Sequence, residues 1–166
     1  MKKRLFTEEF YSKIEQSYVD AFSNLNNVNY GGCGWSAYVV CKILRSKGIP
    51  AEIYFQEYAP IEGFIKENGV NFDKACKKVI TTKRGWKIPN NHIMVKVGDR
   101  YFDSDGEFNK AMVDTSTRTS LFTLKRALKE ACWNQSFAYA NSNLSKKKVD
   151  TIRKFSTLVD NIIQEK

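Results

Sequence analysis

Residues 33–55 read CGWSAYVVCKILRSKGIPAEIYF, and this stretch decides how the chain is organised. Apolar residues recur at helical spacing in its first part, which predicts a helix over residues 33–47. Gly48 is typical of a helix C-cap and Pro50 cannot continue a helix, so the helix is expected to end there. The β-branched and aromatic residues at 51–55 then predict a strand. The stretch therefore places a cysteine at the N-terminus of a helix that leads directly into a strand.

A second stretch, residues 91–105 with the sequence NHIMVKVGDRYFDSD, predicts a β-hairpin. Its strands are expected at residues 91–97 and 100–103, joined by the two-residue loop Gly98-Asp99. Glycine at the first central position of such a loop favours a type II′ turn. The hairpin carries the chain's only histidine near its beginning and two aspartates near its end.

This loop fixes which side chains share a face of the hairpin, because alternate residues of a strand point to opposite faces. One face is predicted to carry His92, Met94, Tyr101, Asp103 and Asp105, and the other Val95, Val97, Arg100 and Phe102. Asp105 lies directly opposite His92 and Asp103 lies diagonally, so both are candidates to hold the imidazole. We favour Asp103, because it continues the strand whereas Asp105 precedes an expected turn at Gly106.

The remaining chain is predicted to add more helices than strands. Helices are expected at residues 7–25, 72–80, 121–132 (with Thr119 or Ser120 as cap) and 145–164, and a short strand at 111–114. Helices, then an antiparallel sheet, then further helices indicate the α+β class. We expect one domain spanning residues 1–166.

The composition is that of a globular protein, with 166 residues, 42% hydrophobic and 13% aromatic. No window approaches the roughly 18 consecutive apolar residues of a membrane span. The first residues lack the apolar stretch of a signal peptide, so we expect a cytoplasmic protein without membrane contact. Four cysteines without a C-x-x-C pair favour neither a disulfide framework nor a zinc site. Three of them lie in helical patterns and are expected to be buried: Cys41, Cys76 and Cys132.

The formal charge of +9 suggests an acidic protein partner or nucleic acid as possible ligands of a basic surface. No RNP-type motif, helix-turn-helix pattern or zinc finger accompanies this charge. We therefore interpret most of the lysines as solvated surface residues.

Cys33, His92 and an aspartate form a constellation suited to nucleophilic catalysis by a thiol. The positive end of the helix dipole would stabilise a thiolate at Cys33. His92 would take the thiol proton and later return it to a leaving amine, while the aspartate fixes the tautomer of the ring. The backbone N–H of Cys33 is a candidate oxyanion donor, joined by the side chain of Asn27, with Asn29 and Tyr30 as weaker candidates.

The residues GCGWSA at 32–37, followed by ILRSKGIPAEI at 43–53, resemble the core of the transglutaminase-like, papain-type cysteine enzymes. The resemblance covers about residues 30–56 and 91–106, where the hairpin is similar to the family's second and third catalytic positions. It implies a helix packed on an antiparallel sheet, Cys33 as nucleophile, His92 as base, Asp103 as orienting acid, and no cofactor. The short interval between Cys33 and His92 and the absence of a calcium-site acid cluster favour the small hydrolytic members.

We thus expect a cysteine hydrolase, of thiol protease type, that cleaves an amide or isopeptide bond of a protein or peptide through a thioester. An acyltransferase, a transglutaminase or a deamidase would use the same three residues, because the cleft and not the triad selects the acceptor. A different class also stays open: a non-catalytic module whose basic surface binds nucleic acid or an acidic protein.

Overall fold

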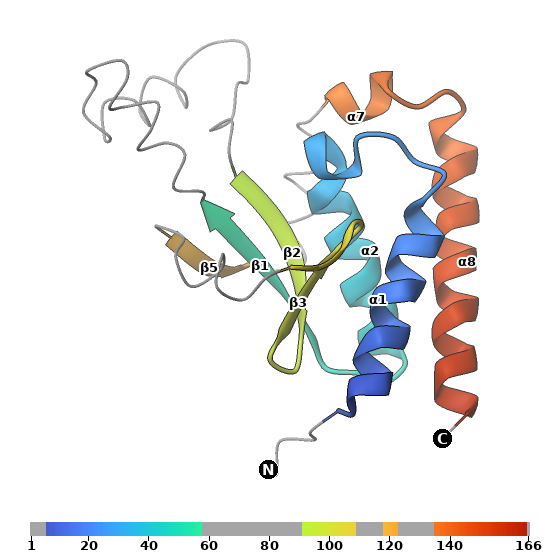
Figure 1. Cartoon of the computed structure of the whole chain (residues 1–166). Coiled ribbons are helices and arrows are strands. Elements are labelled where there is room, and N and C mark those ends of the chain that lie inside the picture. The colour runs from blue at the N-terminus through green and yellow to red at the C-terminus, as the bar shows by residue number, and fades with distance from the viewer. Residues whose placement is uncertain (1–5, 58–90, 109–117, 123–134, 166) are drawn as a thin grey trace.

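The computed structural model describes residues 6–57, 91–108, 118–122 and 135–165 (Figure 1). Its helices are α1 (Glu8–Phe22), the π-helical turn η1 (Val28–Gly32), α2 (Cys33–Ser46), α7 (Gln135–Tyr139) and α8 (Leu144–Gln164). Its strands are β1 (Ala51–Glu57), β2 (Asn91–Val97), β3 (Arg100–Asp103), β4 (Gly106–Phe108) and β5 (Arg118–Phe122). The strands form one antiparallel sheet in the order β4-β3-β2-β1-β5. The predicted α+β class is confirmed.

The hairpin of β2 and β3 has the predicted register. Val95 pairs with Phe102 and Val97 with Arg100, which leaves Gly98-Asp99 as the loop. Gly98 has a φ of 62°, the left-handed value that the first central position of a type II′ turn requires. Asp99 accepts a hydrogen bond from the Tyr11 hydroxyl at 3.0 Å, so the loop is also attached to α1.

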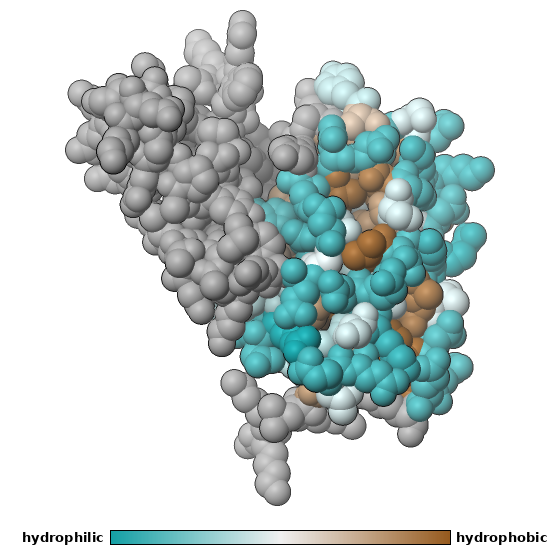
Figure 2. All heavy atoms as spheres, viewed as in Figure 1, coloured by the Kyte–Doolittle hydropathy of each residue, from teal (hydrophilic) through white to brown (hydrophobic). Residues whose placement is uncertain are grey.

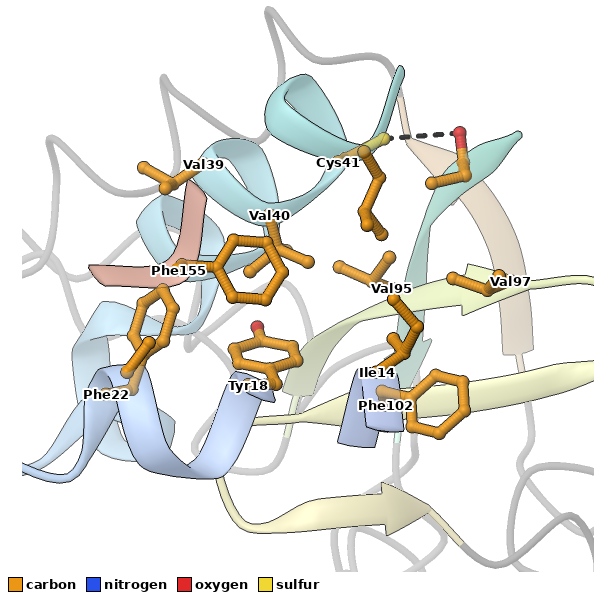
Figure 3. Close-up of a cluster of buried hydrophobic side chains, with 14 of the residues drawn as sticks. Ile14, Tyr18, Phe22, Val39, Val40, Cys41, Val95, Val97, Phe102 and Phe155 are labelled. Carbon is orange, nitrogen blue, oxygen red and sulfur yellow. Dashed lines mark hydrogen bonds between the residues drawn. The ribbon is translucent and has the colours of Figure 1, made fainter. Parts of the chain in front are cut away.

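The core lies between one face of the sheet and the helices (Figure 3). Side chains from α1, α2, the sheet and α8 meet there, among them Ile14, Tyr18, Phe22, Val40, Val95, Val97, Phe102 and Phe155. Each fully buried apolar side chain of this size contributes about 1.5–3 kcal/mol by leaving water. α8 lies alongside α1 on the side away from the sheet, as Figure 1 shows. α2 packs directly against β1 and β2, and these contacts position its N-terminus.

Cys41 is a buried core residue, as its pattern predicts. Its thiol donates to the carbonyl oxygen of Ala51 at 3.2 Å, and burial raises its pKa to about 11. Such a thiol stays protonated at neutral pH and is unreactive. Cys76 and Cys132 lie outside the described residues.

The prediction of a helix over residues 121–132 is wrong at its start. Leu121 and Phe122 belong to β5, which pairs with the free edge of β1 and satisfies its backbone groups. Residues 119 and 120 are therefore strand residues and not helix caps. The rest of that helix, the helix predicted at 72–80 and the strand at 111–114 lie outside the described residues.

The terminal helix is confirmed as α8, and the short elements η1, β4 and α7 were not predicted. η1 precedes α2, and α7 lies in a stretch that has no clear helical periodicity. The face seen in Figure 2 is largely hydrophilic over the described residues, with small apolar areas between the helices. No helix among the described residues combines the length and the apolar character needed to cross a bilayer.

Candidate active site

Cys33 is the first residue of α2 and is half-buried. The last two residues of η1 before Cys33 are glycines, and each position requires glycine for a different structural reason. Gly31 has a φ of 137°, which a residue with a side chain rarely adopts. At Gly32 an added Cβ would lie 2.9 Å from the Phe137 ring, so this glycine lets the backbone approach α7 closely. The two glycines before the cysteine therefore set the entry of the chain into α2.

α2 continues directly from η1, and its first turn is anchored to the core. Gly32 is both the last residue of η1 and the N-cap of α2, and it has helical backbone angles (φ −102°, ψ −4°). Ser36 donates to the carbonyl oxygen of Cys33 at 3.0 Å and accepts from the Tyr18 hydroxyl at 3.1 Å. Burial raises the pKa of Tyr18, so its hydroxyl keeps the proton that it donates. Cys33 is thereby attached to α1 through two fully buried side chains.

His92 and Asp103 form a buried pair at the end of the sheet where β2 begins and β3 ends. Nε2 of His92 lies 2.7 Å from Oδ2 of Asp103, and the two residues are 4% and 6% exposed. Oδ1 of Asp103 accepts the backbone N–H of Asp105 at 2.8 Å. Both carboxylate oxygens are thus engaged, which fixes the carboxylate and with it the plane of the imidazole. Figure 1 shows α2 beginning at this same end of the sheet.

The pKa of His92 reports two contacts of the ring. Burial lowers this pKa, but hydrogen bonds to Asp103 and to Cys33, together with their negative charges, raise it more, to about 9. Nε2 is the ring nitrogen that faces Asp103. The raised pKa means that the folded site favours the protonated ring. A positive charge in this position stabilises a thiolate.

Asp105, the alternative orienting acid, points elsewhere. It is exposed, and its Oδ2 accepts a hydrogen bond from Nδ2 of Asn29 in η1 at 2.7 Å. Of the two aspartates that the sequence leaves as candidates, Asp103 is the one in hydrogen-bond contact with His92.

The predicted oxyanion donors lie in the loop before Cys33. Asn27 is exposed and has a left-handed φ of 57° immediately before η1. The side-chain amide of Asn29 donates a hydrogen bond from Nδ2 to Asp105. The Tyr30 side chain lies outside the described residues. The Cys33 backbone N–H lies at the junction of η1 and α2, and the oxyanion roles of this group and of Asn27 stay predictions.

Sequence reasoning missed several residues that build this site. A serine three residues after the helix-starting cysteine is a signal for the Ser36 contact, because Ser and Thr often bond to carbonyls one turn back. The contacts of Tyr18 and Phe137 have no local signal, since their partners lie 18 and more than 100 residues away along the chain.

Within the described ranges, no group of three His, Cys, Asp or Glu residues is placed to hold a metal ion. Comparisons with protein-family models, with curated proteins and with solved structures give no match for this chain.

Proposed function

We propose that this protein is a thiol hydrolase that cleaves an amide or isopeptide bond with Cys33 as nucleophile, His92 as acid and base, and Asp103 as orienting acid. The proposal is carried by one observation: Nε2 of the buried His92 ring lies 2.7 Å from Asp103, and a hydrogen bond to Cys33 is among the causes that raise the pKa of this ring. A carboxylate, an imidazole and a thiol in this order are the parts that thiol catalysis needs. The resemblance of residues 30–56 and 91–106 to the transglutaminase-like, papain-type enzymes favours the same assignment.

The first half-reaction begins from the thiolate of Cys33 and the imidazolium of His92. The sulfur attacks the carbonyl carbon, and the oxygen becomes an oxyanion next to the Cys33 backbone N–H. The carbon–nitrogen bond then breaks while His92 gives its proton to the departing amine. The products of this step are a free amine, a thioester on Cys33 and a neutral imidazole.

In the second half-reaction the neutral imidazole takes a proton from water, and the resulting hydroxide attacks the thioester carbonyl. Collapse of the intermediate releases a carboxylic acid and restores the thiolate and the imidazolium. The Asp103 carboxylate stabilises the imidazolium at each stage in which it forms. Both its oxygens are held, so the ring need not reorient between the two steps.

Alkylation of the cysteines tests the nucleophile and its base directly. Iodoacetamide at pH 5.5 should modify Cys33 much faster than Cys41, whose thiol is buried and stays protonated. His92→Ala should lower the Cys33 rate by about tenfold or more, because it removes the charge that stabilises the thiolate. Glu52→Gln, a change of an exposed carboxylate on β1, is the matched control and should leave the rate unchanged. Equal rates for Cys33 in the wild type and in His92→Ala would contradict the proposal.

An acyl-enzyme test then separates the reactions that share this mechanism. p-Nitrophenyl acetate should give a burst of nitrophenol and an acetyl group on Cys33 that mass spectrometry locates. Decay of that thioester in water identifies a hydrolase, whereas faster decay with acetylated product on adding glycinamide identifies an acyltransferase. Failure of Cys33→Ser to abolish the burst would rule out the nucleophile.

A further inference from the structure

A groove of about 500 Å³ lies beside the proposed catalytic residues. Its walls are the last turn of α1, the loop after it, η1, and the turn between β3 and β4. η1 runs directly into Cys33, and the β3–β4 turn follows directly on Asp103. The groove is therefore within reach of a polypeptide bound at the candidate active site.

The inner wall of the groove is apolar. It is lined by three side chains that are otherwise buried in the hydrophobic core: Phe22, Leu25 and Val28. Such a wall favours a ligand that brings a hydrocarbon stem.

One edge of the groove carries an exposed carboxylate, that of Asp105. Two contacts fix its position: its Oδ2 accepts from Asn29, and its backbone N–H donates to Asp103. The other end of the Asn29 amide, Oδ1, is buried without a hydrogen-bond partner among the described residues. An unsatisfied buried oxygen is unfavourable, so the hydrogen bond from Nδ2 to Asp105 is the described contact that orients the Asn29 side chain. The Asp105 carboxylate is thus held in a defined position at the edge of the groove.

The opposite wall also favours a cation, because it is the C-terminal end of α1. The helix dipole is negative there, and the last turn of α1 contains no basic residue. Nζ of Lys154, which does not line the groove, donates to the carbonyl oxygen of Asp20 in this turn at 2.6 Å. Among the described residues, Asp105 is the one charged side chain that lines the groove.

We infer that the groove binds a basic side chain, lysine or arginine, of the polypeptide substrate. Its stem would lie on Leu25 and Val28, and its charge would face Asp105. The inference rests on the proposed function in that the ligand is taken to be part of a substrate. It names a specificity determinant for that substrate: a basic residue near the bond that is cleaved.

The test measures binding without catalysis, in the full chain with Cys33→Ala. The probes are N-acetyl-lysine-N-methylamide and its uncharged analogue N-acetyl-norleucine-N-methylamide, titrated while amide chemical shifts are followed by NMR. The lysine probe should shift the amides of Asn27, Ser104 and Asp105 and saturate at a lower concentration than the norleucine probe. Asp105→Asn keeps an acceptor for Asn29 but removes the charge, and should weaken lysine binding about tenfold. Glu52→Gln, on a strand outside the groove, should leave the affinity unchanged.

Equal affinity for the two probes, or equal lysine affinity in Asp105→Asn, would overturn the inference. Its failure is distinct from failure of the proposed function. If lysine binds but Cys33 is no more reactive than Cys41, the groove is a cation site in a protein that is not a thiol enzyme. If Cys33 is reactive and lysine does not bind, only the specificity is wrong.

Discussion

The Tyr18 hydroxyl lies 3.1 Å from Oγ of Ser36, and this hydrogen bond joins α1 to the first turn of α2 beneath Cys33. Ser36 also donates to the Cys33 carbonyl oxygen, so one buried hydroxyl connects the core to the backbone of the proposed nucleophile. Ser36→Ala should leave the Tyr18 hydroxyl unpaired and lower the free energy of unfolding by about 1–3 kcal/mol. Urea denaturation measures this change. Tyr18→Phe in the same background removes the unpaired group and should restore part of the stability; a further loss of the same size would contradict the pairing.

Replacing Asp103 by asparagine should change the titration of His92. The hydrogen bond and charge of Asp103 raise the His92 pKa toward about 9, so Asp103→Asn should lower that pKa by more than one unit. NMR titration of the single imidazole measures it. Cys33 alkylation at pH 5.5–7 should slow in parallel. Asp105→Asn changes a carboxylate that is bound to Asn29 and should give a smaller shift of the His92 pKa; a larger one would make Asp105 the orienting acid.

The same pKa predicts how stability depends on pH. His92 titrates near 6.5 in the unfolded chain and at about 9 in the folded one, so the folded state binds its proton more tightly. This contribution is fully present below pH 6.5 and is lost as the pH rises through about 9; its full size is on the order of 3 kcal/mol. Urea unfolding at intervals from pH 6 to 9.5 should show this decline. His92→Gln should show a flatter profile over the same range, and identical slopes would refute the assignment.

Gly32→Ala should destabilise the protein although it adds only one methyl group. The added Cβ would meet the buried Phe137 ring at 2.9 Å, and overpacking of this kind costs about 1–3 kcal/mol. The midpoint of thermal unfolding should fall accordingly. Gly32→Ala combined with Phe137→Leu makes room for the methyl group and should lose less stability than the sum of the two single changes. Simple additivity would mean that the two positions are not in contact.

Local patterns predicted those parts of the fold that local chemistry decides. Helix α2, its end before Pro50 and the hairpin around Gly98 follow from spacing, caps and turn residues, and the structure has them. The hairpin register also limited the partners of His92 to two aspartates. Whether Cys33, His92 and Asp103 catalyse a reaction stays a prediction.

Long-range partners decided the rest. Leu121 and Phe122 fit a helical pattern, but the unpaired edge of β1 offers them backbone hydrogen bonds that a helix pattern cannot reveal. The orientation of Asp105 toward Asn29 depends on two segments 76 residues apart. Neither contact leaves a trace in the spacing of nearby residues.

The proposed catalytic groups come from the start of a helix and from two neighbouring strands, which only folding brings together. If Cys33 is the nucleophile that we propose, the charge that activates its sulfur is a property of the folded state alone. A chain that opens at the contact between α2 and the sheet exposes an ordinary thiol next to a histidine of ordinary acidity. The rate of Cys33 alkylation at acidic pH therefore also reports whether the native structure is present. A partly unfolded molecule would lose the proposed activity and would not cleave other proteins.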